Sequence, residues 1–359
     1  MLHAPSTHRL RQHERKQATA NPVGVARTPA LMTALTALVG CAFVAAVAIG
    51  PIVVPPQEVI TALLPFGADA GTPHLVVTAI RVPRALVAAL VGAALAVAGA
   101  TMQAIFRNPL ADPGVTGVSA GAAAGAVLGI VAGANNLGMW TVPAAAFIGA
   151  LGAAVIVQIA ATVRGGGPAT IILVGVAISA FLGALISAAI ANSPQDSDLR
   201  SVMFWLNGDL VGRSWDHVIV AVGPITVGIA LIMLLSRDLN VLTLGEATAR
   251  TSGIDTTRLC GILLVLAALI TASAVAVSGS IGFIGLVVPH MIRLVLGADH
   301  RILIPASALL GAAGVLMADL VARMLFDPVV LQTGTVIAFL GSPVFLYLLM
   351  HVSRRRPTA

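Results

Sequence analysis

The stretch RVPRALVAALVGAALAVAGATMQAIFRNPLADPGVTGVSAGAAAGAVLG (81–129) decides the fold class of this chain. It holds two long apolar runs, which the short segment RNPLADP (107–113) separates. A helix needs about 20 mainly apolar residues to cross the hydrocarbon core of a bilayer. The stretch therefore predicts two consecutive membrane-spanning helices.

The same pattern recurs along the rest of the chain and predicts about ten transmembrane helices. The candidate spans are 31–53, 83–106, 114–133, 141–163, 169–191, 217–236, 258–278, 281–296, 302–323 and 333–350. Of all residues, 58% are hydrophobic and only 9% are charged, against about 25% charged in an ordinary soluble domain. We therefore expect an all-α membrane protein whose surface faces membrane lipid.

The positive charge is concentrated at the two ends of the chain. The net charge is +6, and the excess comes from five basic residues against Glu14 within 1–30 and from three arginines at 354–356. We expect 1–30 to be a disordered basic cytoplasmic tail, 31–353 a transmembrane domain and 354–359 a second cytoplasmic tail. A nucleic-acid partner is excluded because no folded region carries a basic face.

The remaining arginines predict the topology. An even number of spans puts both termini on one side, and the positive-inside rule makes that side the cytoplasm. The loop 237–257 is then cytoplasmic, and the outer loops 54–80 and 192–216 are long enough for short surface helices. Five arginines violate the rule and become candidate sites: Arg81, Arg84, Arg200, Arg213 and Arg323.

Glycine and proline mark a faint internal repeat. Gly99 precedes Pro109 by the same spacing as Gly279 precedes Pro289. Because the two segments fall at opposite membrane faces, they indicate an inverted-topology repeat of the kind common in transporters. The eighth span is short, and we expect its helix to be broken at Pro289.

Two motifs around the third span predict local structure. Asn108, Pro109, Asp112 and Pro113 in RNPLADP interrupt the helix and form either an ordinary turn or a packed re-entrant corner. Glycines four apart from 117 to 129 favour close helix packing. The same stretch has the G-x-S-x-G pattern of a hydrolase elbow around Ser119, but the preceding strand and the partner His and acid are missing.

Two further stretches carry charge. LGEATARTSGID (244–255) is amphipathic and is either a solvated surface helix or a coupling helix that inserts into a partner. We expect its solvent-exposed face to carry Glu246, Arg250 and Asp255. The apolar residues Leu244, Ala247 and Ile254 are expected to dock elsewhere. Near the outer end of the ninth span, Asp319 and Arg323 lie four residues apart and can pair along the helix.

Several kinds of chemistry are excluded by what the sequence lacks. It contains no GxxxxGK[ST] phosphate loop, and its one lysine, Lys16, lies in the tail. Cys41 and Cys260 have no metal-ligand or disulfide spacing. The predicted spans also lack the acidic chain of a proton-coupled carrier. We therefore expect no enzyme activity, metal or cofactor on this chain, and ATP bound by a partner.

Several long motifs together resemble the FecCD family of ABC permeases, which import iron–siderophores, haem and cobalamin. The resemblance runs from about 31 to 353. Its segments are 81–127, LTLGEATARTSGI (242–254), VSGSIGFIGLVVPHMIRLVLGADHR (277–301), LIPASALLGAAGVLMADLVAR (303–323) and GTVIAFLGSPVFLYLL (334–349).

The resemblance implies a permease subunit in the bacterial cytoplasmic membrane that carries an iron–siderophore complex, or alternatively haem or cobalamin. It also implies a second permease subunit, two cytoplasmic ATP-binding subunits and an extracytoplasmic substrate-binding protein. Arg81, Arg84 and Arg323 match arginines that dock the binding protein.

The resemblance also assigns two cytoplasmic sites. ATPase coupling falls on Gly245, Glu246, Ala249, Arg250 and Gly253. The gate falls on Gly166, Gly167, Pro168, Ala169 and Thr170. Pro168 and Ala169 replace the hydroxyl pair of the cobalamin permease, which leaves the gate chemistry open.

Overall fold

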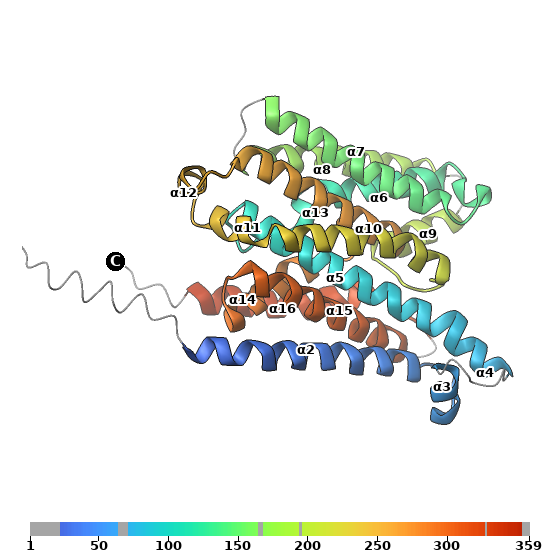
Figure 1. Cartoon of the computed structure of the whole chain (residues 1–359). Helices are drawn as coiled ribbons and strands as arrows, with labels where there is room; N and C mark the ends of the chain where they lie inside the picture. Colours follow the sequence, from blue (N-terminus) through green and yellow to red (C-terminus); the bar gives the residue numbers. More distant parts are fainter. Residues whose placement is uncertain (1–21, 64–70, 164–167, 194–195, 327–328, 354–359) are drawn as a thin grey trace, which may run out of the picture.

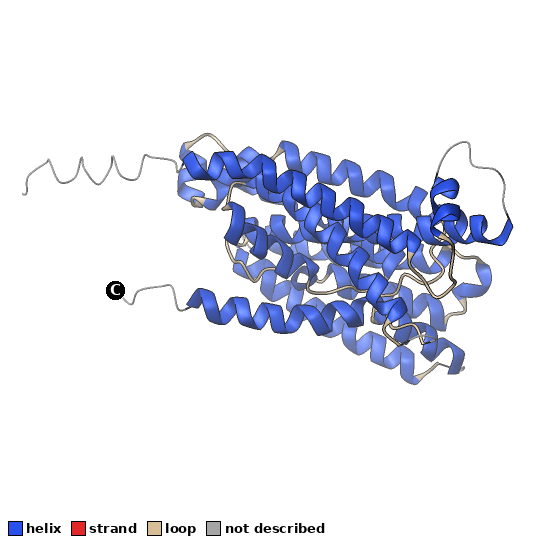
Figure 2. Ribbon diagram, turned by 90° about the horizontal axis from the view of Figure 1, so that it is seen from below, coloured by secondary structure: helices blue, strands red, loops and turns tan. Residues whose placement is uncertain are grey.

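The computed structural model describes residues 22–63, 71–163, 168–193, 196–326 and 329–353. Within these ranges the chain is helical, and its single β-bridge, between Phe326 and Val329, forms no strand. Figure 2 shows the helices gathered into one bundle. The expected all-α fold is confirmed.

The described residues contain seven helical segments that are long and apolar enough to cross a membrane. They lie in α2 (Pro22–Ala48), the continuous helix of α4 (Gly71–Leu75), η1 (Val76–Arg81) and α5 (Val82–Ile105), α7 (Thr141–Val163), α8 (Pro168–Ala191), α10 (Trp215–Leu234), α13 (Thr256–Ser278) and α15 (His300–Met324). The remaining predicted spans correspond to two shorter apolar helices, α6 (Val118–Val131) and α14 (Ile284–Leu296), and to the apolar stretch Thr333–Leu348 of α16 (Thr333–Ser353). The short elements between them are α3 (Pro56–Leu63), η2 (Pro113–Thr116), η3 (Ala134–Leu137), α9 (Asp196–Leu206), α11 (Ser236–Thr243) and α12 (Glu246–Thr251).

Two helices begin earlier than the sequence indicated. Helix α2 starts at Pro22, so the part of the predicted tail from 22 to 30 is helical, while residues 1–21 lie outside the described ranges. The second helix starts at Gly71 and continues past Pro83. The N–H of Val82 donates to the carbonyl of Val77, and this wider π turn accommodates the proline ring.

Glycines let the central helices approach backbone to backbone. A Cβ atom added to Gly99 of α5 would lie 1.9 Å from the carbonyl oxygen of Gly285 in α14. One added to Gly92 would lie 2.2 Å from the carbonyl oxygen of Gly311 in α15. Gly121 of α6 faces α7 in the same way, with 2.3 Å to the carbonyl of Gly149. The packing interpretation of 117–129 is therefore confirmed.

The break in the eighth span lies before Pro289, and the prediction of a break at Pro289 was wrong. Helix α14 runs without interruption through Pro289, and the non-helical backbone is instead at 279–283, where Phe283 has a φ of +66°. The N–H of Ser280 donates to the carbonyl of Trp205 over 3.2 Å. Irregular backbone is tolerated at this depth because surrounding protein satisfies it.

The helices define two ends of the bundle. In Figure 1 the start of α2, the end of α16, α11 and α12 lie at one end, here called the α12 end. Helices α3, α4 and α9 lie at the opposite end, here called the α9 end. The loops 54–80 and 192–216 thus carry short helices as expected. The inverted repeat stays a prediction, although its two segments do pack together through Gly99.

Candidate functional site

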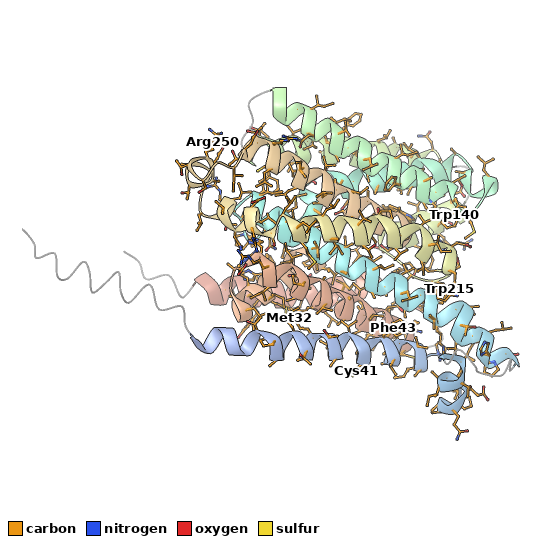
Figure 3. All side chains as sticks on the ribbon, in the orientation of Figure 1. Met32, Cys41, Phe43, Trp140, Trp215 and Arg250 are labelled. Atoms are coloured by element: carbon orange, nitrogen blue, oxygen red, sulfur yellow. The ribbon has the colours of Figure 1, made fainter. Side chains whose placement is uncertain are left out.

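Helix α12 is short, solvent-exposed and bounded by two glycines. Gly245 has a φ of +123° and Gly253 a φ of +84°, which side chains with a Cβ rarely adopt. Arg250 pairs with Glu246 over 2.6 Å, and both side chains are largely exposed. Figure 3 shows Arg250 at the α12 end, with Trp140 and Trp215 near the α9 end. The sequence thus located a protruding charged helix correctly.

The buried side of this helix is narrow. Ala249 is fully buried, whereas Leu244 is 71% exposed and Ala247 is also exposed. The sequence did not say where Leu244 and Ala247 dock, and their exposure shows that they do not pack within this chain. The exposed Leu244 beside charged residues gives α12 a mixed surface that suits a protein partner.

Arg250 also fixes α12 to the next transmembrane helix. Its Nε donates to the hydroxyl of Thr256 over 3.3 Å, at the first turn of α13. Asp255 caps that turn by accepting from the N–H of Arg258. Arg250 therefore links α12 to α13 by a side-chain hydrogen bond, in addition to the connecting chain.

Arg84, Asp319 and Arg323 form a buried charge cluster near the α9 end, here called the Asp319 cluster. Nε and Nη2 of Arg84 both donate to the Asp319 carboxylate, with distances from 2.9 to 3.1 Å. Nε of Arg323 lies 3.3 Å from Oδ2 of Asp319, and the hydroxyl of Thr333 donates to Oδ1 over 3.0 Å. The predicted pairing of Asp319 with Arg323 is confirmed, and Arg84 is a partner that the sequence did not indicate.

Arg81 belongs to the same region but makes no ion pair among the described residues. Its guanidinium donates to the backbone carbonyls of Val47 and Ala48, the last two residues of α2, and of Ile52 in the loop that follows. The carbonyls of Val47 and Ala48 are left without helical partners where α2 stops, and Arg81 satisfies them. Arg81 thus ties α2 to the second helix.

The three proposed docking arginines are buried in the isolated chain. Arg81 is 4% exposed, Arg84 9% and Arg323 6%. Their observed partners all lie within this chain, so direct capture of a partner's carboxylate requires a local opening. The docking role stays a prediction, and the geometry gives each arginine a structural role.

The gate segment lies only partly within the described residues. Gly166 and Gly167 fall outside them, while Pro168, Ala169 and Thr170 form the first turn of α8. Proline is favoured at this position because the first turn has unpaired N–H groups in any case. The gating role of the segment stays a prediction.

The RNPLADP corner combines both interpretations that the sequence left open. Asn108 and Pro109 lie in an exposed turn, where the Asn108 side chain accepts from the N–H of Leu110 over 3.0 Å. Pro113 is buried, and Asp112 caps η2 through the N–H of Gly114 over 2.8 Å. Burial raises the pKa of the Asp112 carboxyl, although that backbone hydrogen bond opposes the shift.

A polar cluster near the α12 end was not predicted from the sequence. Nη1 of Arg293 in α14 donates to Oε1 of Gln103 over 2.9 Å, and Nε2 of Gln103 donates to the carbonyl of Leu286 over 3.1 Å. Gln103 is 3% exposed. The sequence does place one Gln and one Arg inside otherwise apolar predicted spans. Because buried polar groups need partners, this pattern could have indicated that the two side chains pair.

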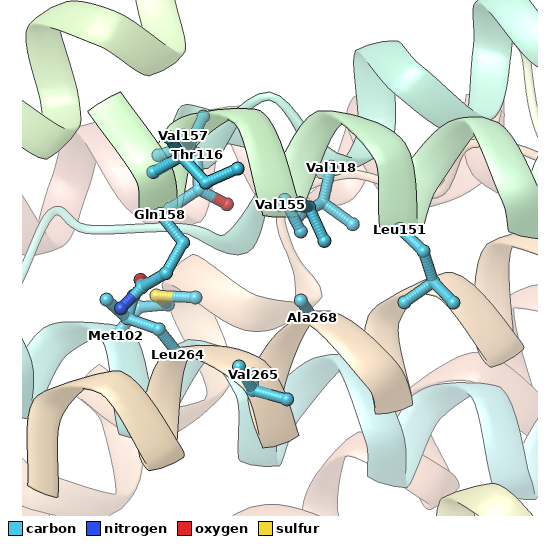
Figure 4. A pocket seen from close by; sticks show the side chains of 12 residues that line it. Met102, Thr116, Val118, Leu151, Val155, Val157, Gln158, Leu264, Val265 and Ala268 are labelled. Carbon is cyan, nitrogen blue, oxygen red and sulfur yellow. The ribbon is translucent and has the colours of Figure 1, made fainter. Parts of the chain in front are cut away.

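A cavity of about 160 Å³ lies between α5, α6, α7 and α13. Figure 4 shows its mainly apolar lining, to which Gln158 and Thr116 contribute polar groups. A cavity near 150 Å³ holds a molecule about the size of benzene. It is therefore too small to serve as the path of a metal chelate.

The comparisons with known proteins agree on one family. Residues 36–351 match the FecCD transport family. The chain is 43% identical over 288 residues to the cobalamin import system permease protein BtuC of Halobacterium salinarum, covering 80% of this chain and 76% of that protein. It is 38% identical over 317 residues to the Fe(3+) dicitrate transport system permease protein FecD of Escherichia coli, covering 88% and 96%.

A solved structure shares the fold. It is an inward-facing metal-chelate type ABC transporter, 30% identical, with a TM-score of 0.80 over 90% of this chain and 99% of that chain. The chain belongs to the FecCD transport family and is a multi-pass membrane protein.

Proposed function

We propose that this chain is the membrane-spanning permease subunit of an ATP-driven importer, and that it translocates an iron–siderophore complex delivered by a substrate-binding protein. The family match across nearly the whole helix bundle carries this proposal. Permease subunits of such importers work with ATPase subunits, and α12 offers an exposed, charged surface for that contact. ATP is bound and hydrolysed on the partner, so this chain needs no cofactor.

We prefer an iron chelate as the substrate because the similarity to an iron dicitrate permease extends over nearly the whole of that protein. The match to the iron dicitrate permease covers 96% of that protein, more than the 76% covered in the cobalamin permease. The higher identity to the cobalamin permease, 43%, favours a second candidate, cobalamin. Haem is the remaining alternative within the same architecture.

The translocation path is proposed to lie between two permease subunits. Helix α8 supports this because only 11% of its most apolar 18-residue stretch is buried within the chain. This is the lowest share among the seven long segments. A partner helix or lipid must cover the rest. The segment 165–170 that precedes and begins α8 is proposed as the cytoplasmic gate.

The α12 end is proposed to face the cytoplasm of a bacterial cell, with both termini on that side. The basic ends of the chain support this through the positive-inside rule. Cysteines introduced at Thr248 and Ser353 should react with an impermeant thiol reagent only after the membrane is opened. Labelling of either cysteine in intact cells would refute this orientation.

The α9 end is proposed to receive the substrate-binding protein through Arg81, Arg84 and Arg323. Breaking a close interfacial charge pair costs about 2–5 kcal/mol, so Arg84→Glu should weaken association by well over tenfold. The same change also places a second carboxylate beside Asp319, and folding must therefore be measured alongside. Arg81→Lys, which keeps the charge, is the milder variant. If both variants associate with the substrate-binding protein as the wild type does, these arginines have only a structural role.

Uptake in a strain that lacks this chain tests the substrate. Restoring the chain should restore accumulation of a radioactive ferric siderophore, and Gly253→Pro should abolish it while the protein still inserts. Labelled cobalamin and haem serve as parallel substrates in the same strain. Restoration of cobalamin or haem uptake alone would replace the iron–siderophore assignment.

A further inference from the structure

Helix α11 is held to the start of α15 by one asparagine. Nδ2 of Asn240 donates to Oδ1 of Asp299 over 2.7 Å. Oδ1 of Asn240 accepts from the backbone N–H of His300 over 2.8 Å and lies 2.8 Å from Nδ1 of the same histidine. One amide therefore bridges the cap and the first residue of α15.

The donors and acceptors of this bridge follow from the chemistry of its members. An ionised carboxylate only accepts, so Asp299 fixes the amide with its NH₂ group toward the carboxylate. The amide oxygen must then face His300, and Nδ1 of that ring carries the proton. His300 is 1% exposed, so this end of the bridge is sheltered from water.

The bridge joins the helix that carries α12 to a helix that runs the length of the bundle. Thr243 ends α11, and α12 follows after Leu244 and Gly245. Leu239 and Leu242 are both buried and pack α11 against the bundle. Helix α11 therefore supports α12.

Helix α15 then continues to the opposite end. Its 25 residues span about 37 Å, more than the hydrocarbon core of a bilayer. Near its far end lie Asp319 and Arg323, members of the Asp319 cluster. Figure 1 shows α11 and the start of α15 at the α12 end and the last turns of α15 at the α9 end.

We propose that Asn240 is a positioning residue that transmits displacement of α12 to α15, and through α15 to the Asp319 cluster. This rests on the proposed function, in which the ATPase subunits contact α12. Without the bridge, α11 keeps its apolar contacts but loses its polar link to α15. Movement of α12 then reaches α15 less completely.

The nearly isosteric variant Asn240→Asp tests the proposal. It replaces the donor that faces Asp299 with a second carboxylate and leaves the oxygen that faces His300. The double variant Asn240→Asp with Asp299→Asn returns a donor to the same pair, and Asn caps a helix as well as Asp does. Thr243→Ala is the matched control, because it removes a 2.8 Å hydrogen bond to the carbonyl of Asn240 that stays within α11.

The measurement is ATPase activity of the complete transporter with and without loaded substrate-binding protein. Asn240→Asp should assemble and keep its basal ATPase, while stimulation by the binding protein falls at least about fivefold, the lower limit of a typical coupling effect. The double variant should recover most of the stimulation, and Thr243→Ala should match the wild type. Should Asn240→Asp not assemble, Asp299→Ala, at an exposed position, should show a smaller loss of the same kind.

Three outcomes overturn the proposal. Normal stimulation in Asn240→Asp, or in Asp299→Ala where that variant is needed, removes the role of Asn240. A loss that the double variant does not recover, or that Thr243→Ala shares, indicates general weakening of α11. A wild-type complex that the binding protein does not stimulate overturns the proposed function itself, and the role of Asn240 with it.

Discussion

Removal of the Asp319 carboxylate should be among the most damaging single changes in this chain. Asp319 is 1% exposed and is the only carboxylate paired with Arg84 and Arg323 among the described residues. Asp319→Ala leaves two guanidinium groups buried with no counter-charge and leaves the hydroxyl of Thr333 without its acceptor. Breaking a buried pair by removing one partner costs about 3–5 kcal/mol.

The matched control is the exposed pair on α12. Glu246→Ala breaks a 2.6 Å ion pair between exposed side chains, and such pairs contribute about 0.2–1 kcal/mol. Unfolding in detergent micelles, followed by tryptophan fluorescence, measures both variants under one set of conditions. Asp319→Asn should fall between them, because the amide still accepts a hydrogen bond from Arg84 but carries no charge.

The expected order of unfolding free energies is Glu246→Ala above Asp319→Asn above Asp319→Ala. A second double variant, Arg84→Asp with Asp319→Arg, should recover part of the loss if the Arg84–Asp319 pair itself holds α5 to α15. If Asp319→Ala unfolds within error of Glu246→Ala, the cluster does not stabilise the fold and the reasoning from its burial is wrong.

Three further predictions use other parts of the chain. Gly99→Ala should destabilise the bundle by about 1–3 kcal/mol, since its Cβ would meet the carbonyl of Gly285, while Gly152→Ala, with nothing within 4 Å, should be neutral or stabilising by up to about 1 kcal/mol; unfolding midpoints check both, and equal effects would contradict the packing argument. Burial raises the pKa of Asp299, but hydrogen bonds from Asn240 and the N–H of Arg301, with nearby positive charge, outweigh it and leave the pKa below its ordinary value. The ionised Asp299 should thus contribute its full stabilisation above about pH 4, and this contribution should be lost as the pH falls through the lowered pKa. A pH titration of the unfolding free energy checks this, and an Asp299→Asn variant that follows the wild type at every pH would contradict it. Glu246→Arg should leave insertion intact but remove stimulation of the partner ATPase by loaded binding protein, and unchanged stimulation would place the contact elsewhere.

The sequence predicted the helices well because each span depends mainly on local composition. Runs of about 20 apolar residues have one stable arrangement in a bilayer, and no distant contact is needed to recognise them. The glycines of 117–129 were interpreted correctly for the same reason, since their four-residue spacing lies on one helix face. The segment of α12 was recognisable from its amphipathic pattern of charged and apolar residues.

The parts that failed depend on contacts between distant segments. The partner of Arg84 is Asp319, far away in the sequence, and no local pattern indicated that pairing. The break at 279–283 was assigned to Pro289, because proline is the obvious helix breaker, whereas backbone partners from other loops decide where the helix actually stops.

Reconstituted transport tests the central claim most directly. The chain would be placed in lipid vesicles with its ATPase, binding protein and any second permease subunit, and uptake of a radioactive ferric siderophore would be measured with ATP supplied on the ATPase side. Accumulation should require both ATP and the binding protein, and it should persist when a proton ionophore removes any pH gradient. Accumulation that proceeds without ATP and stops when the ionophore is added would contradict the assignment of this chain as the permease subunit of an ATP-driven importer.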